Sequence, residues 1–187
     1  GGNTTTTTDK DGNTTTTNTK TEKKEDGTVV NNETSTVKDK DGNIISETVK
    51  KEEIRNDGTW SSSVSKTENY IIEDGTRVSE TSGFETQFDK DGNTLNETQI
   101  SKKEEIKTNG VSIISESSET TERDASGEIR NRITFESKET KADEKTERVE
   151  SIHSRAADGS FETRMNATIA DGVVINAESI TTISTSD

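Results

Sequence analysis

Apolar residues alternate with polar ones along short stretches of the chain, and a glycine-containing segment interrupts these stretches every 15 to 18 residues over most of the length. Trp60, Val64, Tyr70 and Ile72, for example, all occupy even positions. A period of two is typical of a β-strand with one preferred face. The spacing leaves about 10–13 residues for each strand, so the pattern predicts a succession of long strands separated by tight turns.

The predicted turns are marked by glycines that, with few exceptions, follow Asp or Asn. Asp-Gly and Asn-Gly between β-rich runs favour hairpins, because glycine adopts the positive φ that such turns require. DKDGN (9–13, 39–43 and 89–93) suits a three- to four-residue loop that ends in a left-handed glycine. We expect an eleventh turn near Asp143, within KADEKT (141–146). The other ten are expected at Gly12, Gly27, Gly42, Gly58, Gly75, Gly92, Gly110, Gly127, Gly159 and Gly172.

These signals predict an all-β fold: a repetitive antiparallel hairpin array, as a long meander of 10–11 strands, curled or single-layered. The alternative is a β-solenoid with 15–17-residue coils, but Asp-Gly turns are hairpin chemistry and favour the meander. Segment 141–157 is the best helix candidate and would be a local exception. We interpret 1–187 as a single repetitive β domain, with an N-terminal edge segment (1–8), hairpin repeats (9–172) and a C-terminal apolar strand (173–187).

The composition provides little material for a core. Leu, Ile, Val and Phe make up only about 17% of the 187 residues, a level that by itself is typical of disorder. Against disorder, the chain has no Pro and is dominated by Thr, which is β-branched and favours strands. The few aromatic side chains are therefore expected to be largely buried: Trp60, Tyr70, Phe84, Phe88, Phe135 and Phe161.

The net charge of −14 limits the classes of partner. We expect no nucleic-acid partner, because phosphate binding needs a basic surface. No apolar run of about 18 residues exists, so no membrane insertion is expected. Self-association remains open, since a sheet that is polar on both faces has a weakly specified register and tends to pair with other chains.

Catalysis has little support in the sequence. His153 is the one histidine and there is no cysteine, so a Cys–His pair is excluded and a serine triad has one possible base. No nucleophile motif lies near SIHSR (151–155). Few apolar residues are available to line a pocket that would raise a carboxylate pKa. We predict no enzyme, no small-molecule substrate and no organic cofactor, with His153 as a surface residue.

The DKDGN segments resemble the start of a calcium-binding loop, in which alternate side-chain oxygens coordinate the ion. The full EF-hand loop needs a Glu at its twelfth position, and the chain has Lys20, Lys50 and Ile100 there. Turn chemistry is therefore the favoured interpretation, with calcium as the alternative. The candidate calcium ligands are Asp9, Asp11, Asn13, Asp39, Asp41, Asn43, Asp89, Asp91 and Asn93.

Other features favour an exported protein. The first residue is glycine and no signal-like segment precedes the repeats, as expected for a processed or excerpted chain. Five sequons for N-glycosylation are compatible with a surface location, at Asn3, Asn13, Asn32, Asn96 and Asn166. We predict an extracellular or cell-surface protein.

The functional prediction is a structural subunit of an extracellular fibre, filament, surface layer or matrix, whose partner is a second copy of itself. A thin core and a repeat in which each unit contacts mainly its neighbours both favour this interpretation. The two terminal segments, NTTTTT (3–8) and VVINAESITTIS (173–184), have high β-propensity and no Lys or Pro. The alternative is a calcium-dependent adhesion or polymer-binding β-repeat module.

Overall fold

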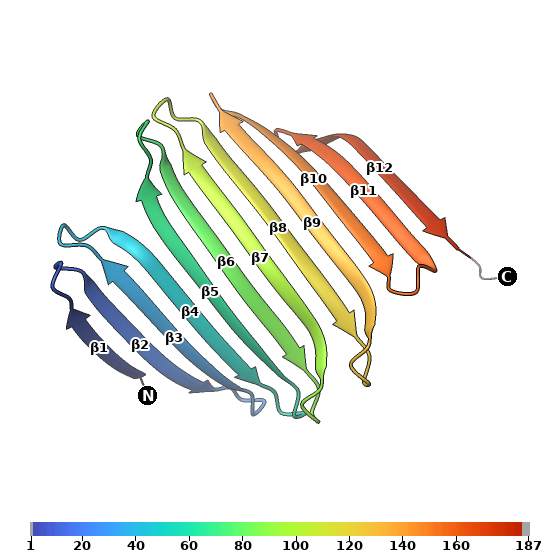
Figure 1. Cartoon of the computed structure of the whole chain (residues 1–187), viewed down its shortest axis with the longest axis horizontal. Coiled ribbons are helices and arrows are strands. Elements are labelled where there is room, and N and C mark those ends of the chain that lie inside the picture. The colour runs from blue at the N-terminus through green and yellow to red at the C-terminus, as the bar shows by residue number, and fades with distance from the viewer. Residues whose placement is uncertain (1, 185–187) are drawn as a thin grey trace.

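The protein is one open, single-layered β-sheet in which twelve antiparallel strands follow one another in chain order. The structure is a computed structural model that describes residues 2–184. Each strand pairs only with its neighbours in the sequence, and the two terminal strands lie at opposite edges of the sheet (Figure 1). The predicted meander is therefore confirmed.

The strands are 7 to 14 residues long, so most exceed the usual five or six. Their bounds are β1 Gly2–Thr8, β2 Thr14–Lys23, β3 Val29–Lys38, β4 Ile44–Ile54, β5 Trp60–Ile71, β6 Arg77–Phe88, β7 Thr94–Ile106, β8 Ser112–Arg123, β9 Ile129–Ala142, β10 Lys145–Ala156, β11 Phe161–Ala170 and β12 Val173–Ile183.

All ten predicted turn glycines have positive φ, between 74° and 89°. In the first turn the Gly12 N–H donates to the Asp9 carbonyl (3.2 Å) and the Asp9 N–H donates to the Asn13 carbonyl (2.9 Å). This is a type I turn followed by a left-handed glycine, the commonest three-residue hairpin loop. The same two bonds recur in the seven other Gly turns up to Gly127.

Two of the last three turns, those after β9 and β11, differ. Asp143 and Glu144 both have positive φ (49° and 65°) and form a two-residue turn, as do Asp171 and Gly172. Positive φ at both central residues matches the right-handed twist of a hairpin. The eleventh turn therefore lies where KADEKT predicted it.

Three expectations are corrected. The solenoid alternative is wrong, because every neighbouring pair of strands is antiparallel and consecutive. The helix considered for 141–157 is wrong, because the segment contains the 143–144 turn and strand β10. The count of 10–11 strands is too low, since residues 2–8 form a full strand paired with β2 instead of an extension outside the repeat.

One row of directly paired residues crosses the whole sheet from Thr6 in β1 to Ala177 in β12. Paired residues of an antiparallel sheet lie on the same face, so this row defines a face. We call it face A, and the opposite face, which carries Trp60 and Phe88, face B. The row runs Thr6, Thr16, Thr36, Glu47, Thr67, Thr81, Lys102, Glu116, Ser137, Glu150, Ala167 and Ala177.

The sheet has almost no core. The buried apolar residues of the described chain are Val30 (4% exposed) and Val78 (3% exposed), each three residues after a turn glycine. The predicted burial of the aromatic residues is wrong, because no second layer covers either face. Tyr70, Phe84 and Phe161 are exposed, and the other three are half-buried: Trp60, Phe88 and Phe135.

Stability must then come from contacts within the sheet, and β4–β6 show two kinds of them. On face B, Trp60 and Phe88 are direct cross-strand partners whose rings stack with centroids 3.7 Å apart. Cross-strand aromatic pairs of this kind stabilise sheets by about 0.5–1.5 kcal/mol beyond the area they bury. The pair joins the first residue of β5 to the last residue of β6, so it holds together the ends of these two strands.

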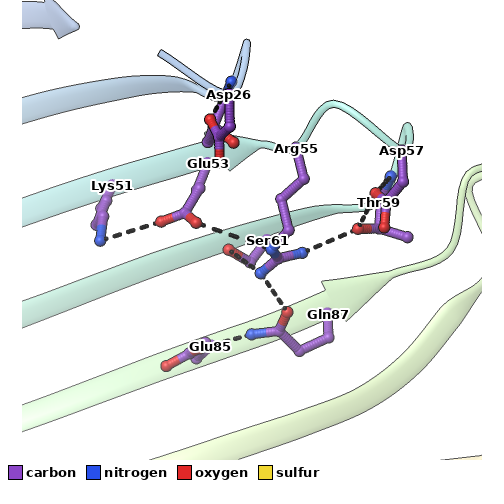
Figure 2. Close-up of polar contacts among 10 residues, drawn as sticks. Asp26, Lys51, Glu53, Arg55, Asp57, Thr59, Ser61, Glu85 and Gln87 are labelled. Carbon is purple, nitrogen blue, oxygen red and sulfur yellow. Dashed lines mark hydrogen bonds and ion pairs between the residues drawn. The ribbon is translucent and has the colours of Figure 1, made fainter. Parts of the chain in front are cut away.

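A polar network lies on face A at the same end of β5 and β6 (Figure 2). The Arg55 guanidinium donates to Thr59 Oγ1 (3.2 Å), Ser61 Oγ (3.5 Å) and Gln87 Oε1 (3.2 Å). It also forms an ion pair with Glu53 Oε1 (3.8 Å). One side chain thus connects β4, β5 and β6.

The described part of the chain contains no helix that is long and apolar enough to cross a membrane.

Candidate functional site

The outer edge of β12 presents a row of backbone groups without a strand partner in the described chain. The Ser184 N–H donates to the Ser160 carbonyl (3.0 Å), so this residue directs its backbone groups toward β11. Because these directions alternate along a strand, Ala177, Ser179 and Thr181 direct their N–H and C=O groups outward. An unpaired row of this kind is a template for another strand.

The outer edge of β1 has the same character. The Asp9 N–H bonds to Asn13 on the β2 side, so Thr4, Thr6 and Thr8 direct their backbone groups outward. These residues occupy face A, as do the outward-directed residues of β12. The two edges of the sheet therefore match in hydrogen-bonding phase as well as in face.

Neither edge strand carries the residue types that usually protect a sheet edge. Every residue of β1 and β12 is exposed. Neither strand contains Lys, Arg or Pro, and Glu178 is the one charged residue in the two. Natural sheets commonly block open edges with Lys, Pro or bulges. The one irregularity is a register shift in β12 beside the last turn, between the partners of Thr168 and Ile169.

β12 exposes more large aliphatic side chains than any other strand. Five Val and Ile side chains are between 59% and 73% exposed: Val173, Val174, Ile175, Ile180 and Ile183. Exposed apolar side chains on an open edge are unusual for a monomer, since a partner strand would bury part of them.

The candidate calcium ligands lie in three separate turns. The 9–13 and 39–43 turns lie at one end of the strands, and the 89–93 turn lies at the opposite end (Figure 1). The three segments therefore do not converge on one site. Among residues 2–184 no group of three or more His, Asp or Glu side chains is arranged to hold a metal ion.

Within each of these turns the first Asp bonds to its own loop. Asp39 Oδ1 accepts the N–H groups of Asp41 and Asn43 (both 2.9 Å), and its Oδ2 accepts the Asn43 side-chain amide (3.1 Å). Asp89 makes the same three bonds with Asp91 and Asn93. Asp9 accepts the two backbone bonds, from Asp11 and Asn13. These contacts stabilise the loop without an ion.

The hydrogen bonds have an electrostatic consequence. The Asn43 side-chain amide holds the pKa of Asp39 below its ordinary value of 3.8, and the backbone N–H of Asn43 adds to the effect. The pKa of the turn carboxylates is lowered in the same way, by backbone or side-chain donors two to four residues ahead, in Asp26, Asp57, Asp74, Asp89, Asp124 and Asp158. The lowered pKa favours the ionised form of these seven carboxylates in the folded chain.

His153 lies in β10 and is half-buried on face B. Its Nε2 lies 2.7 Å from Glu162 Oε1 on the neighbouring strand. Glu162 also accepts bonds from the Arg164 guanidinium at 3.0 Å. The hydrogen bond from His153, followed by that from Arg164, lowers the pKa of Glu162. This is a cross-strand polar cluster, and the prediction that the protein is not an enzyme stays a prediction.

The glycosylation candidates differ in accessibility. Asn3 in β1 and Asn166 in β11 are exposed. The other three are half-buried: Asn13 in the first turn, Asn32 in β3 and Asn96 in β7. Asn3 lies on the outer strand, so a glycan there would stand next to the open edge.

Face B is hollowed along the middle of its strands, which the sequence analysis missed. Three adjoining hollows of about 390, 630 and 730 Å³ extend from β2 to β11. Their centre is a row of small residues, Ser82, Ser101 and Ser117, which are direct cross-strand partners. Longer side chains such as Phe84 and Lys103 flank the row, and both hollows and row are open to solvent. Only the strand register, which sequence spacing leaves open, brings these serines together.

Comparison with models of protein families, with curated proteins and with solved structures found no match. Function must therefore be argued from the geometry of this chain.

Proposed function

We propose that the protein is a structural subunit of an extracellular fibre, filament, surface layer or matrix, and that it assembles by β-strand addition at the edges of its sheet. The supporting observation is the pair of open edges, β1 and β12, which lack Lys, Arg and Pro and direct unpaired backbone groups outward. Strand addition gives these groups partners and buries part of the aliphatic surface of β12.

The single-layered architecture supports the same proposal. A sheet without a second layer has no core that limits its width, because each strand depends mainly on its two lateral neighbours. Adding a copy at an edge extends the structure by the same contacts that already hold it together. The partner is another copy of the chain, and the location is outside the cell.

Deletion of the edges tests this function. Removing residues 1–8 or 173–187 should abolish polymerisation, seen by negative-stain electron microscopy and sedimentation, while the remaining strands stay soluble. Ser179→Pro is the milder variant, since the outward N–H of Ser179 is not needed for the β11–β12 ladder. Glu178→Pro is the matched control, because the Glu178 N–H points inward and its loss should loosen β12 itself.

Two outcomes would count against the proposal. If the full chain is a stable monomer at high concentration, or if both truncated chains polymerise like the full chain, edge addition is not the assembly mechanism. A stable monomer would favour the second candidate function.

That second candidate is a polymer-binding or calcium-dependent adhesion module, and the hollowed face B supports it. Serine hydroxyls along the hollow and the exposed ring of Phe84 offer hydrogen bonds and a stacking surface to a linear polymer. Phe84→Ala should then weaken retention on an immobilised polysaccharide, with Phe161→Ala on face A as the control. A large rise in melting temperature with calcium would support the calcium-dependent form.

A further inference from the structure

The geometry of the two edges points to a specific junction, and this inference rests on the proposed assembly function. We propose that β12 of one copy pairs antiparallel with β1 of the next copy, so that the meander continues from chain to chain with faces A and B unchanged. The result is a polar filament in which every junction is the same.

The even number of strands permits this junction. Alternate strands run in opposite directions, so the first and twelfth strands of one sheet are antiparallel to each other. A second copy placed beside the first in the same orientation therefore brings its β1 antiparallel to β12. With an odd number of strands the same placement would require a parallel pair, which has a different hydrogen-bond pattern.

The hydrogen-bonding phase also permits it. Successive pairs along the row from Thr6 to Ala177 are alternately hydrogen-bonded and non-hydrogen-bonded. The reason is that the backbone of each residue bonds to only one of its two lateral neighbours. The outermost pairs at both ends, Thr6–Thr16 and Ala167–Ala177, are of the non-hydrogen-bonded kind. A junction between Ala177 and the Thr6 of the next copy would be hydrogen-bonded, so the alternation continues across it.

Face and charge agree with this junction. The outward-directed residues of both edges have their side chains on face A, so pairing them keeps each face continuous. Any two registers that preserve the faces differ from each other by a multiple of two residues. β1 has no charged residue and β12 has Glu178. A β12–β12 contact would instead place two copies of Glu178 on the same face of adjacent strands and leave both β1 edges open.

A heterologous contact of this kind propagates into a filament unless its rotation closes a ring. Covering both edges with same-edge contacts requires two different interfaces, one between β1 strands and one between β12 strands. The β12–β1 junction covers both edges with a single interface.

Disulfide trapping between single-cysteine variants tests the junction, since the chain has no cysteine of its own. In the register that continues the Thr6–Ala177 row, Thr5 lies opposite Glu178 on face B, as a non-hydrogen-bonded pair. Such pairs have Cα atoms about 4.5 Å apart, within the range that a disulfide spans. Thr5→Cys is mixed with Glu178→Cys, or with Ile180→Cys for the register shifted by two, and is oxidised under assembling conditions.

The expected result is a disulfide-linked heterodimer from Thr5→Cys with one of these two face B variants. Thr5→Cys with Ser179→Cys is the matched control, because Ser179 lies on face A, and this mixture should give several-fold less product. Efficient linkage of Glu178→Cys or Ile180→Cys to itself, without heterodimer, would overturn the junction while leaving assembly by strand addition intact. Equal linkage in the control would also overturn it. Absence of any assembly would overturn both.

Discussion

The middle of the sheet and its C-terminal edge use the same kind of hairpin but are held very differently. In β4–β6, Trp60 stacks on Phe88 on one face and the Arg55 network connects three strands on the other. In β12 all residues are exposed and the strand has one lateral neighbour. The longest aliphatic run of the chain therefore lies where its own fold covers it least.

This difference shows how a one-layered sheet distributes stability. In a two-layered protein the apolar residues would face each other across a core, and here they have no second layer to face. Cross-strand pairs, worth about 0.2–1 kcal/mol each, take over that role. A strand with two neighbours makes twice as many such pairs as an edge strand, so an edge gains most from a partner.

Substitution of the central aromatic pair should have the largest effect. Trp60→Ala removes the stacking on Phe88 and the apolar area shared between β5 and β6, so we expect a loss of about 2 kcal/mol in the free energy of unfolding, about half of the cost at a fully buried site. Ile180→Ala in β12 is the control and should cost less than about 0.5 kcal/mol in the monomer. Urea unfolding of a non-assembling variant measures both. Equal costs would contradict the contrast between the two regions.

The polar network should matter next. Arg55→Ala deletes the donor that joins β4, β5 and β6, with an expected cost of about 1 kcal/mol. Arg55→Lys should recover only part of it, because an ammonium cannot reach three acceptors with the geometry of a guanidinium. Arg164→Ala in β11 is the control, since its side chain is 65% exposed and pairs with Glu162 alone. If Arg55→Lys behaves like the unsubstituted chain, the network acts through charge alone.

Acid should have a smaller effect, which arises in the hairpin turns. Seven turn Asp residues have a lower pKa in the folded chain than their ordinary value of 3.8; for Asp57 the hydrogen bond from the Thr59 hydroxyl is the main cause. Their contribution is present above about pH 4 and is lost as the pH falls through the folded pKa. The free energy of unfolding should therefore decline below about pH 4. The decline should be shallower in Asp57→Asn, and an identical decline would show that the turn bonds are not its source.

The comparison also shows what sequence can predict in such a protein. The glycine turns were predictable residue by residue, because positive φ at a position such as Gly12 is a local requirement that the sequence records. The turn near Asp143 followed from the spacing of the repeat. Burial was not, because it depends on a second layer whose absence no local pattern reveals; Phe84 was expected inside and lies exposed. The serine row of face B and the reach of Arg55 to Gln87 depend on register across 16 to 32 residues, which spacing alone leaves open.

The edge strands fall between these cases. Their lack of Lys and Pro is visible in the sequence, which is why 3–8 and 173–184 supported the prediction of self-association. The hydrogen-bonding phase of Thr6 relative to Ala177 was not visible, because it follows from the registers of all eleven strand pairs between them.

Hydrogen exchange at the amides of β12 tests the central claim most directly. In the monomer, the outward N–H groups of Ala177, Ser179 and Thr181 should exchange quickly, while those of Glu178 and Ile180, which bond to β11, should be slower. On assembly the three outward amides should become protected, and those of β5 should change little. Outward amides that stay unprotected in the assembled state would contradict the account, because strand addition cannot occur at β12 without them.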